Sequence, residues 1–496
     1  MTSLELAFRA ASPRLNPKAT PLSAWLIHMA VLAFWLILFS RIFVGDGVAA
    51  WSVGLAYVGY DTALLLFVAS AWPSLWRDAP PAPAPGGPRP SVGVIIAARD
   101  EAAVLAATID ALLAQTDPPD AIWLADDGST DESPAKLRAR YGLEPPEIGR
   151  CGAPGPIAPT LRWLRLPHGG KARALNAALA YVDTDVVLTV DADTLLEPSA
   201  IAAVRAAFAA DPDLVVGGGV LAPHCDASLM GRCLREFQTY EYVRNFLARL
   251  AWSRLDCLLL ISGAFAAFRR DAVLAVGGFD TRCLVEDYEL MHRIHRWAVD
   301  RGLNWRVRIL NGARARTDAP GRILPFLRQR RRWFAGFLQT QYWNRDMTGN
   351  PRFGALGLAM MPVKALDTMQ PIFGLISAFL LLEFLVAGRW SALIPASGFA
   401  LAKIAFDLAY GMVAVEAYRR WTGAPRRLSL TAGLVAAALE PFSFQILRHA
   451  GAAWGWVAFL GQSRAWGGSS RSGRSGPVSG APERGPNAPV IGGEVH

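Results

Sequence analysis

The sequence predicts a soluble α/β domain inserted between two sets of apolar, membrane-spanning helices. Apolar stretches of helical length occur near both ends of the 496-residue chain, whereas residues 91–321 alternate short apolar strands with helices. Hydrophobic residues make up 52% of the chain and charged residues only 18%. This composition is too apolar for a purely soluble protein and too charged for an all-membrane one, which favours a mixed architecture.

Two apolar segments lie near the N-terminus, within residues 22–76 and after a short cytosolic segment at 1–21. Residues 22–40 are long enough to cross the hydrocarbon core as a helix, and no small-residue cleavage site follows, so we expect no cleaved signal peptide. A second span is predicted at about 48–72. It carries Asp61, which is either an interfacial, snorkelling side chain or a polar contact inside a helix bundle.

The basic residues that give the chain a net charge of +9 flank its apolar segments. A basic chain can bind nucleic acid, but this placement better fits the positive-inside rule and contact with anionic lipid. Arg9, Arg14 and Lys18 precede the first span, and Arg77 follows the second. We therefore expect a multi-pass protein of the cell (inner or plasma) membrane with a cytosolic α/β domain, a lipid bilayer as partner and no nucleic acid.

The α/β domain follows a Pro-rich linker at 77–90. Strands are predicted at 91–98, 121–126, 161–166 and 184–191, and helices at 101–115 and 171–182. Buried apolar strands that alternate with helices indicate a parallel sheet. Residues 142–160 are rich in Pro and Gly and are expected to loop out. The five cysteines form no CxxC pair, so neither a disulfide framework nor a zinc site is expected.

A C-terminal membrane domain is predicted over residues 353–466, with about three spans. The expected spans lie at 371–388, at 391–417 and between 430 and 462. Glu440 and Pro441 interrupt the last stretch, which is compatible with one long span or with two short ones. The low-complexity tail at 467–496 is expected to be disordered.

Four polar clusters stand where predicted strands end, which is the edge at which α/β sheets bind ligands. They are ARDE at 98–101, DDGSTD at 126–131, HGGKARALN at 168–176 and VDADT at 190–194. Asp126 and Asp127 are candidates for hydrogen bonds to a nucleoside, although the same residues make ordinary turns and helix caps. Lys171 follows two glycines at a helix start, which suits a phosphate but is also found on ordinary surface helices.

Carboxylates carry most of the predicted chemistry. Asp191 and Asp193 point to one face of a strand and repel each other unless a cation lies between them. Mg²⁺ or Mn²⁺ prefers such oxygen ligands and bridges to phosphates, although an exposed acidic loop is the alternative. Glu286 and Asp287 precede a helix, where a carboxylate serves as a general base or simply favours the helix N-terminus.

An amphipathic interface helix is predicted at 322–340, within a segment that extends to 352. Its apolar stripe is expected to rest on the membrane, while Gln329 and Arg332 on the opposite face meet a neighbouring domain. Arg330 falls within the apolar stripe and is a candidate for snorkelling to a lipid phosphate.

The ordered series DDGS, GKARALN, DAD, ED and QRRRW resembles the processive family 2 glycosyltransferases, which are membrane-embedded synthases of cellulose, chitin, hyaluronan and poly-N-acetylglucosamine. Residues 259–280 are similar to the acceptor-side segment of that family. The resemblance implies a cytosolic GT-A domain at 91–321, a UDP-sugar donor (glucose or N-acetylglucosamine), a growing β-linked glycan as acceptor and Mg²⁺ or Mn²⁺ as cofactor. It leaves accessory subunits open.

On the donor side, the resemblance implies one role for each matching residue. Asp127, together with Asp126, contacts the uridine, and Lys171 meets the diphosphate. Asp191 contacts the nucleotide, and Asp193, beside Asp191, holds the metal.

On the acceptor side, Asp287 is implied as the general base of an inverting transfer. Gln329 and Arg332 steady the diphosphate, and Trp333 forms a platform under the acceptor sugar. Two positions depart from the family pattern, because Asp100 and Val285 stand where Asn and Thr are often found. A non-processive membrane enzyme that acts on a lipid acceptor is the alternative function, and a nucleotide sensor without activity is a second rival.

Overall fold

The computed structural model describes residues 2–44, 48–73, 89–388, 390–423 and 429–461. Arg77, nearly all of the predicted Pro-rich linker and the predicted tail lie outside the described residues.

An eight-stranded mixed sheet forms the centre of the α/β domain, in the order β3-β2-β1-β4-β7-β6-β8-β5. The strands are β1 Val92–Ala98, β2 Ala121–Asp126, β3 Leu161–Arg165, β4 Val186–Asp191, β5 Thr194–Leu196, β6 Leu214–His224, β7 Phe265–Arg269 and β8 Arg306–Asp318. The first four run parallel, as predicted. Strand β7 is antiparallel to both of its neighbours and β5 is antiparallel to β8, whereas β6 and β8 run parallel. The sheet is therefore mixed, and the prediction of a parallel sheet is wrong for β5 and β7.

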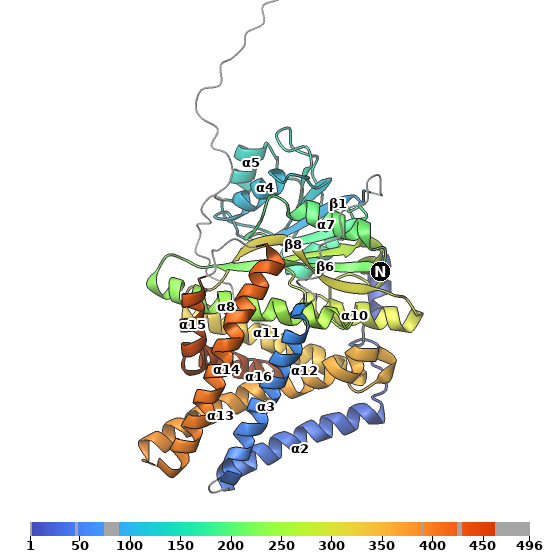
Figure 1. Cartoon of the computed structure of the whole chain (residues 1–496). Helices are drawn as coiled ribbons and strands as arrows, with labels where there is room; N and C mark the ends of the chain where they lie inside the picture. The colour runs from blue at the N-terminus through green and yellow to red at the C-terminus, as the bar shows by residue number, and fades with distance from the viewer. Residues whose placement is uncertain (1, 45–47, 74–88, 389, 424–428, 462–496) are drawn as a thin grey trace, which may run out of the picture.

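Helices cover the sheet (Figure 1). The strands at its centre are almost fully buried; Val92 of β1 and Val190 of β4 are examples. These helices are α4 Leu105–Leu113, α5 Ser133–Tyr141, α6 Lys171–Leu179, α7 Ala200–Ala210, α9 Arg270–Ala275 and α10 Glu286–Arg301. Residues 142–160 contain no helix or strand except an isolated bridge at Cys151, which confirms the predicted loop.

Three helices lie between the sheet and the apolar helices: α8 Leu229–Ser253, α11 Ile323–Trp343 and α16 Phe444–Leu460 (Figure 1). The predicted amphipathic helix is α11, but part of its apolar stripe packs on α16 instead of facing a membrane. A methyl group added at Gly455 of α16 would lie 2.9 Å from the Cβ of Phe334. Leu338 of the same stripe is buried.

The N-terminal segment docks on the α/β domain, which the sequence did not suggest. Helix α1, Ser3–Ala11, begins with a capping box formed by Thr2 and Glu5. After it, Arg14 donates two hydrogen bonds, of 2.8 and 2.9 Å, to the buried carboxylate of Asp280. The start of the chain is therefore tied to the segment that precedes α10.

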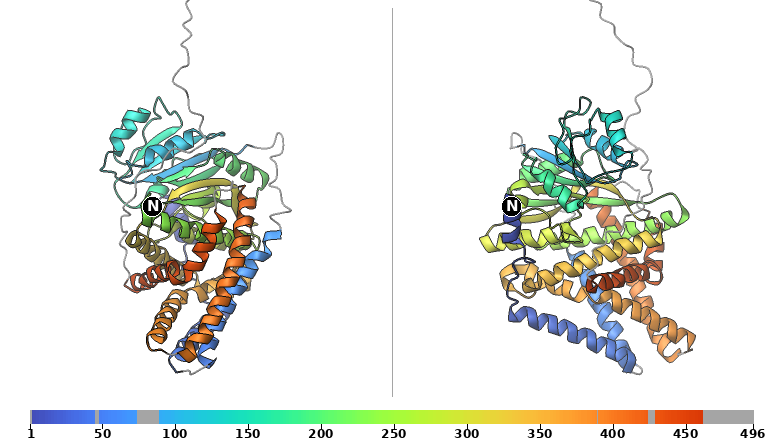
Figure 2. Two further views of the ribbon diagram at one scale, coloured as in Figure 1. Left: turned by 60° about the vertical axis from the view of Figure 1, so that its left-hand side comes forward. Right: turned by 180° about the vertical axis from the view of Figure 1, so that it is seen from behind.

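The remaining apolar helices extend away from the sheet (Figures 1 and 2). They are α2 Leu22–Val44, α3 Val48–Ser70, the π-helical turn Leu356–Met360 with α12 Met361–Asp367, α13 Gln370–Val386, α14 Trp390–Thr422 and α15 Leu430–Leu439, which a 3₁₀ turn at Glu440–Phe442 separates from α16. The last predicted stretch thus forms two short helices. In the part of the chain that the structure describes, no single helix is long and apolar enough to cross a membrane; Leu356–Asp367 with Gln370–Val386, bent by 40°, could do so as a pair.

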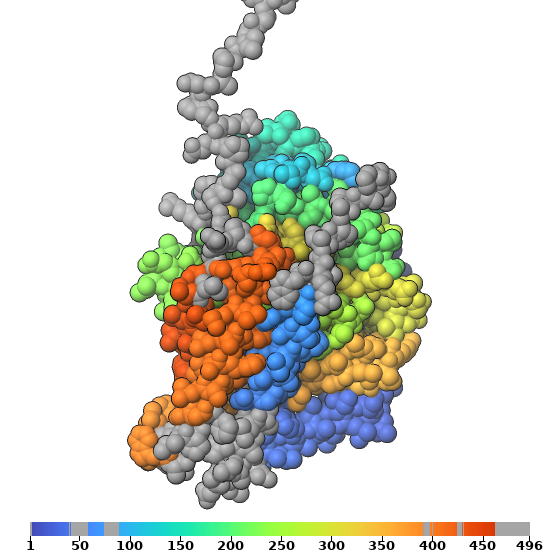
Figure 3. All heavy atoms as spheres, viewed as in Figure 1, coloured from blue at the N-terminus to red at the C-terminus, as the bar shows by residue number. Residues whose placement is uncertain are grey.

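Helices α3 and α14 lie side by side, as the space-filling view also shows (Figure 3). The Nζ atom of Lys403 on α14 lies 2.8 Å from a carboxylate oxygen of Asp61 on α3, and it also pairs with Asp407. The interpretation of Asp61 as a polar contact inside a helix bundle is therefore confirmed.

Candidate active site

The strand-end clusters meet at one edge of the sheet. Strand β1 pairs with β2 on one side, where Ala98 lies opposite Asp126, and with β4 on the other, where Ala97 lies opposite Asp191. The strand order reverses between β1 and β4, and such a switch point is where open α/β sheets bind ligands. The structure therefore brings together the acidic residues that the sequence placed at strand ends.

Asp126 and Asp127 already accept several hydrogen bonds from the chain itself. Asp127 accepts from the backbone N–H groups of Gly169 and Gly170, at 2.7 and 2.9 Å, and its Oδ2 lies 2.8 Å from Nδ1 of His168. Asp126 accepts from the Ser129 N–H, at 2.8 Å. The glycine pair thus holds the loop after β2 against the start of α6. A nucleoside bound here would donate its hydrogen bonds to the same carboxylate oxygens.

Lys171 links the DAD cluster to the Glu286–Asp287 pair. Its Nζ atom lies 2.5 Å from Asp191 and 3.5 Å from Glu286. Burial lowers the pKa of this ammonium, but the two carboxylates outweigh burial and hold the pKa above its ordinary value. A permanent positive charge therefore stands between the two acidic clusters, on the helix start where the sequence predicted a phosphate contact.

Asp193 is buried near two other carboxylates, those of Asp191 and Asp318. Burial, together with the carboxylates of Asp191 and Asp318, raises the pKa of Asp193 to about 7. A divalent cation beside Asp193 would offset the repulsion between these carboxylates. Their oxygen atoms are ligands that fit Mg²⁺ or Mn²⁺. Among the described residues no group of three or more His, Cys, Asp or Glu side chains has the arrangement of a metal site. The remaining ligands would have to come from a bound diphosphate and water.

Asp287 is held as a fixed carboxylate at the start of α10. It accepts hydrogen bonds from the backbone N–H of Gly263, at 2.7 Å, and of Tyr288, at 2.8 Å. A Cβ at position 263 would lie only 3.1 Å from the Asp287 oxygen, so the glycine allows this close approach. Neighbouring Glu286 is buried, and burial raises its pKa although Lys171 opposes the shift.

Arg332 of the QRRRW segment on α11 lies beside the same site. Arg332 donates to the carbonyl oxygen of Leu284 at 3.3 Å. A Cβ on Gly336 would lie 2.5 Å from Val285, so the helix is pressed against the residues that precede Glu286. Gln329 has a buried Oε1 without a hydrogen-bond partner among the residues that the structure describes. The expected orientation toward the α/β domain is confirmed for Arg332 and stays a prediction for Gln329.

Arg330 does not reach outward to lipid, so that expectation is wrong. Its guanidinium forms two hydrogen bonds, of 2.8 and 2.6 Å, with the carboxylate of Glu241 on α8. Only 11% of the Arg330 side chain and 7% of that of Glu241 are exposed. Sequence reasoning missed this pair because the partners are 89 positions apart and no local pattern joins them.

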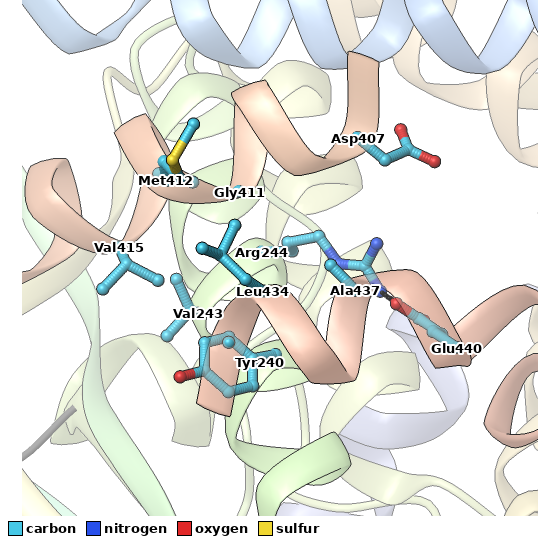
Figure 4. A pocket seen from close by; sticks show the side chains of 12 residues that line it. Tyr240, Val243, Arg244, Asp407, Gly411, Met412, Val415, Leu434, Ala437 and Glu440 are labelled. Atoms are coloured by element: carbon cyan, nitrogen blue, oxygen red, sulfur yellow. Dashed lines mark hydrogen bonds and ion pairs between the residues drawn. The ribbon is translucent and has the colours of Figure 1, made fainter. Parts of the chain in front are cut away.

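A small pocket lies between α8, α14 and α15, with the paired side chains of Arg244 and Glu440 on one side and Asp407 on α14 (Figure 4). Arg448 on α16 connects Glu440, at 3.1 Å, to Glu241, at 3.8 Å. We call these ion pairs, with those of Lys403 and Arg330, the charge network. It consists of two groups of ion pairs, one from Asp61 to Asp407 and one from Arg244 to Arg330, and the pocket lies between them.

Two family models match the chain. Residues 93–277 match the model described as glycosyl transferase family 2, and residues 186–413 match glycosyl transferase family group 2. Together they cover more than half of the chain. The chain thus carries a family 2 glycosyltransferase domain.

Curated relatives support this assignment at low identity. Hyaluronan synthase of Streptococcus pyogenes is 27% identical over 261 residues, which are 50% of this chain and 56% of the relative. Beta-monoglucosyldiacylglycerol synthase of Synechocystis sp. is 26% identical over 274 residues, 52% of this chain and 50% of the relative. Poly-beta-1,6-N-acetyl-D-glucosamine synthase of Staphylococcus aureus is 30% identical over 127 residues, 25% of this chain and 30% of the relative. The chain thus spans about half the length of the first two relatives.

A solved structure shares the fold. The mannosyltransferase PcManGT from Pyrobaculum calidifontis, in complex with GDP-Man and Mn²⁺, has 24% sequence identity and a TM-score of 0.53, covering 80% of this chain and 99% of its own. This likeness, with the family match, confirms the predicted GT-A fold of the α/β domain. That the apolar helices around this domain span a membrane remains a prediction.

Proposed function

We propose that the protein is a membrane-embedded, inverting hexosyltransferase that moves glucose or N-acetylglucosamine from a UDP-sugar onto a growing β-linked polysaccharide. One observation carries the proposal: Lys171 joins the DAD cluster to the pair Glu286 and Asp287, so donor and acceptor chemistry share one site. The catalytic domain would be 91–321.

Asp287 acts as the general base in this proposal. Its carboxylate takes the proton from the acceptor hydroxyl. The hydroxyl oxygen then forms a bond to the anomeric carbon of the donor sugar while the bond from that carbon to the UDP oxygen breaks, which inverts the configuration. The hydrogen bonds from Gly263 and Tyr288 hold Asp287 in one position throughout.

The donor side binds the nucleotide and its diphosphate. Asp126, Asp127 and Asp191 contact the nucleotide, and Lys171 exchanges part of its contact with Asp191 for the diphosphate. Asp193, with Asp191, would hold Mg²⁺ or Mn²⁺, which when bound offsets the negative charge that develops on the departing UDP. The pKa of Asp193, which burial and two neighbouring carboxylates raise, supports this role, because a cation would favour the charged carboxylate over the protonated one.

The acceptor side lies on α11. Gln329 and Arg332 steady the diphosphate, and Trp333 carries the acceptor sugar on its ring. Support comes from the position of this face, which packs on the residues directly before Glu286.

Processive synthesis with export is the finer part of the proposal. The multi-pass chain would lie in the inner or plasma membrane with its catalytic domain in the cytosol, and the polymer would leave along the apolar helices. The charge network supports this path, because it places charged side chains on both sides of the pocket, at the QRRRW helix and at Asp61 and Lys403, within helices predicted to span the membrane.

A non-processive enzyme that glycosylates a lipid is the second candidate, and the likeness to a glucosyldiacylglycerol synthase favours it. Product length separates the two. Membranes that contain the protein are incubated with radiolabelled UDP-sugar and Mn²⁺, and the products are sized. A ladder of long polysaccharide supports the proposal, whereas a single-sugar glycolipid supports the alternative.

A donor screen tests the class of reaction. Purified protein is offered UDP-glucose, UDP-N-acetylglucosamine, other UDP-sugars and GDP-mannose, and nucleotide release is measured. We expect release with a UDP-hexose. Normal nucleotide binding without release from any donor would favour a sensor that only binds nucleotide.

A further inference from the structure

Arg330 lies between two aromatic rings of its own helix. The centre of its guanidinium is 4.6 Å from the ring centroid of Phe326 and 4.6 Å from that of Trp333. These rings belong to residues four positions before and three positions after the arginine, which is the spacing that places side chains on one helix face. A guanidinium this close to an indole ring occupies one of its faces.

Two other helices hold Arg330 in this position. From α8, Glu241 binds the guanidinium with both carboxylate oxygens, at 2.8 and 2.6 Å. From α16, the backbone at Gly451 comes so close that a Cβ there would lie 2.6 Å from the Cβ of Arg330. The planar, bidentate contact with Glu241 fixes the orientation of the guanidinium as well as its place.

We propose that Arg330, anchored by Glu241, is a positioning residue for Trp333. It covers one face of the indole and restrains the ring, so that the opposite face alone is offered to the acceptor sugar. The inference rests on the proposed function, in which Trp333 is the acceptor platform. A restrained ring loses less freedom when a sugar stacks on it, so the pair strengthens acceptor binding without touching donor or acceptor.

The test compares acceptor and donor kinetics in Arg330→Met and Glu241→Gln. Arg330→Met removes the stacked charge but keeps a long side chain. Glu241→Gln keeps the arginine and removes the charged bidentate partner. Arg345→Met is the matched control. Arg345 lies in the 3₁₀ turn after α11, and its guanidinium is likewise close to an aromatic ring, 4.7 Å from the ring centroid of Tyr342.

We expect Arg330→Met to raise the KM for an added product oligosaccharide about tenfold, which corresponds to ~1.4 kcal/mol of lost binding. Glu241→Gln should raise it by a smaller factor. The donor KM and the slow release of UDP without acceptor should stay within about twofold of wild type. Arg345→Met should match wild type throughout.

A double-mutant cycle with Trp333→Ala separates positioning from a general structural role. If Arg330 acts through Trp333, the Arg330→Met/Trp333→Ala protein has the same acceptor KM as Trp333→Ala alone. Additive effects would overturn the inference, as would equal losses of donor and acceptor binding in Glu241→Gln. A wild type that turns over no sugar nucleotide contradicts the proposed function, whereas an active wild type with Arg330→Met unchanged contradicts only the positioning role.

Discussion

At the scale of single residues, the candidate base and its neighbour are held very differently. Asp287 receives two backbone hydrogen bonds, which fix the position of its carboxylate. Glu286 is buried against the ammonium of Lys171. The residue that can take a proton from a substrate is thus distinct from the one that helps to hold Lys171 in place.

Replacing Asp287 with Asn is expected to abolish transfer and to leave UDP binding intact. Asparagine keeps the size of the side chain and an oxygen that accepts from Gly263, but it cannot take up the proton, and general base catalysis typically contributes about 10²–10⁴-fold. Sugar incorporation and UDP binding by calorimetry check this. Joint loss of both would assign Asp287 a structural role.

Asp193 is expected to make metal binding depend on pH. Its pKa is raised to about 7 in the metal-free protein, so below pH 7 the carboxyl is largely protonated and a cation must displace the proton. The affinity for Mn²⁺ with UDP should therefore fall as the pH drops from 7 to 5.5 and change little above pH 8. Titrations at several pH values measure this, and a flat profile from pH 5.5 to 8 would contradict the assignment.

Sequence patterns predicted the residues of this site better than their surroundings. The sequence predicts three of them, Asp191, Lys171 and Glu286, because each ends a strand or starts a helix. The sheet then brings those ends together. Glu241 and Arg330 were not found as a pair, because their contact depends on how α8 packs against α11.

At the scale of elements, short apolar runs revealed the first four strands but not the later ones. Strand β6 contains three consecutive glycines, Gly217 to Gly219, and glycine is depleted in strands. In the structure a Cβ at Gly219 would lie 2.1 Å from the Phe265 ring, and Leu310 approaches Gly217 in the same way. Large side chains of neighbouring strands occupy the space, and such a long-range contact leaves no local pattern.

The contact between α11 and α16 is expected to be sensitive to added volume. Gly455→Ala would place its methyl group 2.9 Å from the carbonyl oxygen of Arg331 and from the Phe334 Cβ. Such overpacking typically costs about 1–3 kcal/mol. Gly411→Ala on α14 is the control, since nothing lies within 4 Å of a Cβ there, and it should be neutral or stabilise by up to ~1 kcal/mol. Thermal unfolding in detergent compares the two; equal melting temperatures would contradict the close packing.

At the scale of the whole molecule, the charge network ties the apolar helices to the catalytic domain. Lys403 neutralises two carboxylates, Asp61 and Asp407, on helices that extend away from the sheet (Figure 1). Charges among apolar helices are costly unless they are paired. The sequence showed the single acid at position 61 but not its partner, which lies more than 300 residues further along.

Lys403→Met is therefore expected to lower the melting temperature of the solubilised protein, because it leaves two carboxylates without their counter-ion. Asp61→Asn in the Lys403→Met background should recover part of the loss, since one repelling charge is removed. A Lys403→Met protein as stable as wild type would show that these ion pairs do not hold the helices together.

The central claim is that one site, with Asp287 as its base, transfers a hexose from a UDP-sugar to a glycan. The most direct measurement follows labelled UDP-hexose with Mn²⁺ in parallel in wild type and Asp287→Asn, recording UDP release and glycan product together. The account predicts that wild type releases UDP in step with a growing glycan, and that the variant binds UDP without forming product. Glycan synthesis by Asp287→Asn at the wild-type rate would contradict it.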